Sequence, residues 1–79
     1  ALLLMSRAEA ERLGYEPLAL LRESTEVGVD PKIMGIGPVP AIRRLLERSG
    51  RALEAYGRVE INEAFAAQVL ACQKHLRID

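Results

Sequence analysis

The hydrophobic pattern changes its period at Asn62-Glu63, and this change limits the folds that the chain can adopt. In Arg58-Val59-Glu60-Ile61 polar and apolar residues alternate, which is typical of a half-buried strand. Farther on, apolar residues lie along one helix face, at Phe65, Val69, Cys72 and Leu76. The pattern predicts a short strand followed by a helix, with a carboxamide and a carboxylate between them.

The first part of the chain is expected to alternate in the same way. Ala1–Met5 is a continuous apolar run, which predicts a strand buried on both faces of a sheet. Ser6-Arg7-Ala8-Glu9 fits a capping box, so a short helix is expected from there to Leu13, with Gly14 at its C′ position. Leu18–Val29 is expected to be a long strand, whose charged middle suggests a sheet edge or an interface with another chain.

A loop and a second helix are expected in the middle of the chain. Asp30–Pro40 holds three of the four prolines and two of the six glycines, which predicts a loop. The apolar spacing of Val39, Ile42, Leu45 and Leu46 predicts a helix, closed by Ser49-Gly50. The resulting order of strand, helix, strand, helix, strand, helix indicates the α/β fold class.

Composition excludes several classes of function. A chain of 79 residues forms one small domain at most, and with 49% apolar but only 4% aromatic residues its core must be aliphatic. The 11 basic and 11 acidic residues cancel, which argues against a nucleic-acid partner. No apolar run approaches the roughly 20 residues of a membrane span, and no basic segment precedes Ala1–Met5 as in a signal peptide.

Asn62 and Glu63 have two interpretations. In the structural one, Asn62 caps the last helix and Glu63 complements its dipole. In the functional one, the N–H groups and the positive end of the dipole favour an anionic ligand or a developing oxyanion at this place. Spacing alone favours the structural interpretation, because Asn is a leading N-cap residue.

Two longer motifs resemble the thiolases, the CoA-dependent acyltransferases that make or cleave 3-oxoacyl-CoA thioesters. They are Asn62-Glu63-Ala64-Phe65-Ala66-Ala67-Gln68 and Gly28-Val29-Asp30-Pro31-Lys32-Ile33-Met34-Gly35-Ile36-Gly37-Pro38-Val39-Pro40-Ala41. The opening Ala1-Leu2-Leu3-Leu4-Met5-Ser6 is also similar, so the resemblance covers essentially the whole chain. Because thiolases are several times longer, we expect an internal segment of an acetyl-CoA C-acetyltransferase or a 3-oxoacyl-CoA thiolase.

The resemblance implies a fold of two similar α/β halves, in which mixed sheets pack against a shared layer of helices. Residues 1–29 would then end the N-terminal half and residues 30–79 would begin the C-terminal half, so the chain spans their junction. It further implies that the partners are acyl-CoA and CoA, the remainder of the thiolase chain, and other subunits in a homodimer or homotetramer. The expected location is cytoplasmic, or mitochondrial or peroxisomal in a eukaryote.

The resemblance also implies site residues. Asn62 matches the Asn that holds a water molecule, which forms an oxyanion hole together with a histidine from outside the chain. Glu63 would orient neighbouring groups, and Met34, Ala64 and Phe65 would line the substrate pocket. Coenzyme A is a substrate in this chemistry, so no cofactor is implied. No metal site is expected either, because one His and one Cys cannot supply a ligand set.

Cys72 and His75 lie three residues apart on the expected last helix, but the resemblance gives neither a catalytic role. Cys72 is expected in the core, and His75 at the surface near the helix C-terminus. The family's nucleophilic cysteine and catalytic histidine motifs do not occur in this chain, so we expect the chain alone to be inactive. The alternatives are a non-catalytic α/β module that binds a partner through its charged strand, and a related condensing enzyme of the same superfamily.

Overall fold

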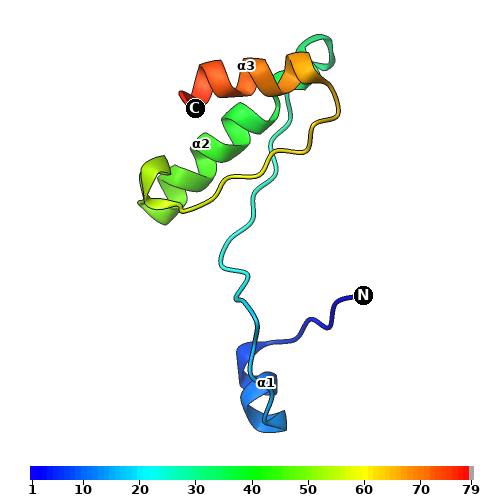
Figure 1. The fold of residues 1–79 in the computed structure, drawn as a ribbon, viewed down its shortest axis with the longest axis vertical. Helices are drawn as coiled ribbons and strands as arrows, with labels where there is room; N and C mark the ends of the chain where they lie inside the picture. Colours follow the sequence, from blue (N-terminus) through cyan, green and yellow to red (C-terminus); the bar gives the residue numbers. More distant parts are fainter. Residues whose placement is uncertain (79) are drawn as a thin grey trace.

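The computed structural model describes residues 1–78, which form helices joined by long connections (Figure 1). In chain order the elements are α1 (Arg7–Leu13), the 3₁₀ helix η1 (Pro31–Ile36), α2 (Pro38–Ser49), the 3₁₀ helix η2 (Leu53–Ala55) and α3 (Ala66–Leu76). Helices α2 and α3 pack together with η1 at one end of the molecule, and α1 lies at the other end (Figure 1).

The three predicted strands are not formed within residues 1–78. Ala1–Met5, Leu18–Val29 and Arg58–Ile61 run as connections without strand pairing. A strand is stable only when a neighbouring strand satisfies its backbone N–H and C=O groups, and none of these three segments pairs with another. The helices of the α/β prediction are therefore present, whereas the sheet is not confirmed.

Helix α1 begins and ends where its sequence predicts. The Ser6 hydroxyl accepts a hydrogen bond from the Glu9 backbone N–H at 3.2 Å. Gly14 has a φ of 72°, the left-handed conformation that favours glycine, and the Tyr15 N–H donates to the Ala10 carbonyl at 2.9 Å. The capping box is only half formed, because the Glu9 carboxylate instead accepts two hydrogen bonds from Arg12, at 2.8 and 2.6 Å.

The expected loop Asp30–Pro40 is helical over most of its length, because η1 occupies Pro31–Ile36 and α2 begins at Pro38, so the loop prediction is wrong there. Asp30 caps η1 by accepting from the Lys32 N–H at 2.9 Å, and Pro38 then occupies the first turn of α2. Proline suits that position because its φ is already helical and its missing N–H needs no partner there. The C-terminal end agrees with the prediction, since Gly50 has a φ of 65°.

Two arginines of α2 hold the segment that leads into η1. Arg44 donates to the carbonyl of Glu26 at 3.4 Å, and Arg48 donates to the carbonyl of Ser24 at 3.1 Å. Arginines one helical turn apart thus bind carbonyls two residues apart. These contacts fix the segment along α2 as it approaches the place where the helices meet.

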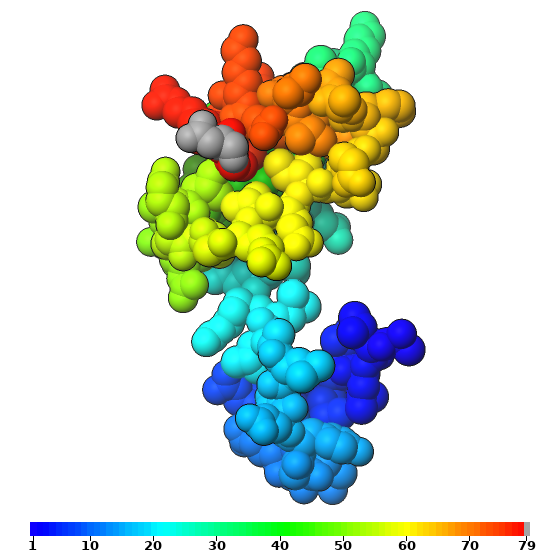
Figure 2. Space-filling model, in the orientation of Figure 1, coloured from blue at the N-terminus to red at the C-terminus, as the bar shows by residue number. Residues whose placement is uncertain are grey.

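The described core is small. Its buried hydrophobic residues are Ala10, Val39 and Cys72, whereas Leu2, Leu3, Leu4, Leu18 and Leu21 are all at least 75% exposed. The radius of gyration is 15.8 Å, compared with about 12 Å for a compact domain of this length. The space-filling view shows the α1 end separated from the α2–α3 end by a narrow waist (Figure 2). Little apolar surface is buried, except where η1, α2 and α3 meet.

Candidate functional site

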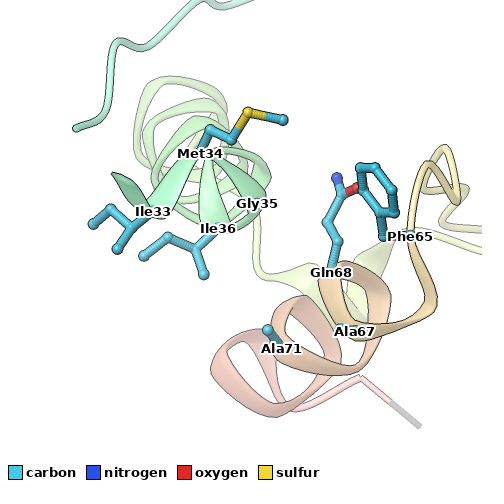
Figure 3. Close-up of a pocket in the computed structure, with 8 residues that line it drawn as sticks. All are labelled: Ile33, Met34, Gly35, Ile36, Phe65, Ala67, Gln68 and Ala71. Atoms are coloured by element: carbon cyan, nitrogen blue, oxygen red, sulfur yellow. The ribbon is translucent and has the colours of Figure 1, made fainter. Parts of the chain in front are cut away.

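An apolar groove of about 420 Å³ lies between η1 and the first half of α3. Its lining residues are Ile33, Met34, Gly35, Ile36, Phe65, Ala67, Gln68 and Ala71. Met34 projects from η1 on one side, and Phe65 and Gln68 lie next to each other on the α3 side (Figure 3). The structure thus places on one groove Met34 and Phe65, the two residues that by the family resemblance are expected to line a substrate pocket.

The two sides of the groove touch at Gly35. A Cβ built on Gly35 would lie 3.8 Å from the Cβ of Gln68, so the backbone of η1 runs directly against α3. One turn along α3, the Cys72 thiol lies 3.7 Å from the Gly35 carbonyl oxygen, and Cys72 is completely buried. The prediction that Cys72 is a core residue is confirmed.

A second, more polar hollow lies immediately before α3. It is lined by Val59, Glu60, Ile61, Asn62 and Glu63. Asn62 and Glu63 are both exposed, so their side chains are accessible to a ligand or to water. Ala64 is exposed and lines neither hollow.

The predicted capping role of Asn62 and the first-turn role of Glu63 are wrong. Helix α3 begins at Ala66, its N-cap is Phe65, and it has neither a side-chain cap nor an acid in its first turn. Phe65 keeps an extended backbone, with φ −145° and ψ 137°, and its carbonyl accepts the first helical bonds from Gln68 and Val69. Because the helix begins four residues after Asn62, the carboxamide of Asn62 is free for another use.

Phe65 is also not the first core residue of its helix. Its side chain is 67% exposed, whereas Val69 and Leu76 are partly buried and Cys72 is fully buried. The apolar stripe of α3 therefore begins at Val69. The phenyl ring is left to form a wall of the groove.

The last turn of α3, beyond the groove, is basic. Arg43 of α2 donates to the His75 carbonyl at 3.0 Å, and Lys74 and His75 lie in the last turn of α3. His75 is exposed there, as predicted. In the part of the chain that the structure describes, no three His, Cys, Asp or Glu side chains gather as metal ligands, and no helix has the length and apolar character of a membrane span.

Sequence reasoning missed much of the groove. Ile33, Ile36, Ala67, Gln68 and Ala71 received no role from the sequence, yet all five line it. Phe65, Gln68 and Ala71 follow one another at intervals of three, so helical spacing from Phe65 could have found the last two. The η1 residues had no comparable signal, because Asp30–Pro40 was expected to be an irregular loop.

Comparisons with known proteins agree on one family. Residues 15–79 match the family described as "Thiolase, C-terminal domain". The chain is 54% identical over 76 residues to the 3-ketoacyl-CoA thiolase of Yersinia enterocolitica, covering 96% of this chain and 20% of the relative. It is 53% identical over 79 residues to Beta-ketothiolase BktB of Cupriavidus necator, covering 100% of this chain and 20% of the relative.

A solved structure has the same arrangement of elements. The crystal structure of the Bacillus anthracis acetyl-CoA acetyltransferase superposes with a TM-score of 0.91 at 53% identity, over 95% of this chain and 19% of that one. The groove and its flanking helices therefore lie within a thiolase-like fold. The chain belongs to the thiolase family and matches its C-terminal domain. It spans about a fifth of the length of the relatives it matches.

Proposed function

We propose that the protein containing this chain catalyses CoA-dependent Claisen condensation of acyl-CoA, or the reverse thiolytic cleavage of 3-oxoacyl-CoA. The observation that carries the proposal is the juxtaposition of Met34 and Phe65 on one groove, with Asn62 lining a second hollow three residues before Phe65 along the chain. The relatives' names supply the reaction class, since they describe acetyl-CoA acetyltransferases and 3-ketoacyl-CoA thiolases.

In this proposal Asn62 stabilises the oxyanion through a water molecule. Its amide N–H₂ donates a hydrogen bond to a water molecule, and that water stabilises the negative charge that develops on the thioester oxygen. A neutral amide is suited to this role because it donates without placing a full charge beside the reacting centre. Asn62 does not cap α3, so the structural interpretation of this residue does not hold, and this supports the assignment. Glu63 would orient neighbouring groups from the same hollow.

The remaining chemistry is proposed to lie outside this chain. A cysteine thiolate takes the acyl group as a covalent thioester, and histidines and a second cysteine move protons. Residues 1–79 would supply the Asn62 arm, the pocket wall with Met34, Ala64 and Phe65, and the junction at 29–30 between two α/β halves. The sheets of those halves would pair with the connections that are unpaired here, and the enzyme would be a cytoplasmic homodimer or homotetramer.

The test uses the full-length protein. Incubated with acetoacetyl-CoA and CoA, it should form two molecules of acetyl-CoA, which can be followed by chromatography of the CoA esters. With acetyl-CoA alone it should form a covalent acetyl-enzyme, detected by the mass of an acetylated cysteine peptide outside this chain. A folded full-length protein that shows neither product formation nor acylation would contradict the proposal.

A further inference from the structure

The groove wall is set at one point of close approach between two elements. Gly35 lies directly after Met34. Its carbonyl oxygen contacts Cys72, and a Cβ added to it would contact Gln68, one turn earlier on α3. Met34 and Phe65 belong to opposite sides of this contact (Figure 3). The separation of η1 and α3 at Gly35 therefore controls how far apart the two walls stand.

Cys72 is the buried residue at this contact. It is 0% exposed, and its sulfur lies 3.7 Å from the Gly35 carbonyl oxygen. Protein interiors are close-packed, so a larger side chain in such a place moves the backbone. A smaller side chain lets the two elements approach each other. The thiol itself is shielded from solvent.

We propose that Cys72 is a specificity-determining residue, which sets the width of the groove between η1 and α3 and so the length of acyl chain that the groove accepts. This inference rests on the proposed function and names the substrate property that the site selects. It explains how a residue without contact to the groove surface acts on the substrate, because Cys72 acts through Gly35 on the position of Met34.

The test measures kcat and KM of the full-length enzyme in thiolysis of acetoacetyl-CoA and of 3-oxooctanoyl-CoA. The quantity compared is the kcat/KM for 3-oxooctanoyl-CoA divided by the kcat/KM for acetoacetyl-CoA. In Cys72→Val the larger branched side chain should raise this ratio by about tenfold, which is the size of a one-methylene effect in an apolar pocket. In Cys72→Ala the ratio should fall by about threefold, because the walls close. Lys74→Ala, at an exposed position of the same helix, should leave the ratio unchanged.

A structural defect alone would lower kcat for both substrates together and would not move the ratio. Ratios within about twofold of wild type in active Cys72→Val and Cys72→Ala enzymes would overturn the inference. If Cys72→Val does not fold, the change of the ratio in Cys72→Ala alone tests the inference. A wild-type enzyme that cleaves neither substrate would contradict the proposed function. An enzyme that cleaves both substrates, but whose ratio does not change in the variants, would contradict only the inference about Cys72.

Discussion

The Cys72 sulfur lies 3.7 Å from the Gly35 carbonyl oxygen, and this contact joins α3 to η1 across the middle of the chain. The contact is partly buried, and Cys72 itself is fully shielded from solvent. Sulfur–oxygen contacts of this kind are weak, so its importance lies in position and not in energy. It holds the two elements that carry Met34 and Phe65 in one fixed relationship.

Replacement of Asn62 by Ala should lower kcat of the full-length enzyme without lowering its stability. Removal of a direct oxyanion donor costs about 10²–10³ in kcat, and a donor that acts through water should cost less, roughly tenfold. Because Asn62 does not cap α3, the melting temperature should stay unchanged. Steady-state kinetics and thermal unfolding measure the two effects.

Ser6→Ala is the matched control for capping. The Ser6 hydroxyl does accept a helical N–H, so its loss should destabilise α1 by about 1 kcal/mol and leave kcat alone. Unchanged turnover in Asn62→Ala, together with a lower melting temperature, would return Asn62 to a structural role.

The ion pair between Glu9 and Arg12 should make the stability of α1 weakly dependent on pH. The hydrogen bond from Arg12 lowers the pKa of the Glu9 carboxyl, and the same bond raises the pKa of Arg12. Because the folded-state pKa of Glu9 lies below its unfolded value, the stabilisation is present above the unfolded pKa and is lost as pH falls through the folded one. Arg12→Gln should return the pKa of Glu9 toward its ordinary value, as measured by NMR titration; an unmoved pKa would contradict the pairing.

Local sequence signals predicted the start of α1 and the ends of α1 and α2, because caps depend on a few neighbouring residues. Ser6 begins α1, and Gly14 and Gly50 end α1 and α2 with positive φ, as their positions in the sequence indicate. The start of α3 could not be predicted in this way. Asn62 is a good cap, but Phe65 stays extended and delays the helix to Ala66.

Long-range features were harder to predict, for a physical reason. Strand pairing depends on backbone partners distant in sequence, so the apolar run Ala1–Met5 has a strand pattern but no strand. The groove likewise depends on how η1 packs against α3, which periodicity does not reveal. Met34 and Phe65 were placed in one pocket by family resemblance, and Gln68 and Ala71 were identified only from the structure.

Gly37→Ala should disturb the wall of the groove, whereas Gly28→Ala should not. A Cβ on Gly37 would lie 3.1 Å from the Met34 carbonyl oxygen, a distance that forces a neighbour to move. A Cβ on Gly28 would meet nothing within 4 Å. We expect Gly37→Ala to destabilise the full-length protein by about 1 kcal/mol and to raise KM for acyl-CoA. Equal melting temperatures and KM values in the two variants would show that the close approach has no consequence.

Met34→Ala and Phe65→Ala should be energetically coupled, because the two side chains line the same groove. In the proposed reaction each single variant would remove one apolar wall from the acyl chain, and we expect each to lower kcat/KM for acetoacetyl-CoA by about tenfold. The effects of residues that share a ligand are not additive. The change in activation free energy of the double variant should therefore differ from the sum of the two single changes by about 0.5–3 kcal/mol. Leu70→Ala, at an exposed position of α3 outside the groove, provides the comparison and should combine additively with Met34→Ala. Strict additivity of Met34→Ala with Phe65→Ala would mean that the two residues act on separate parts of the substrate.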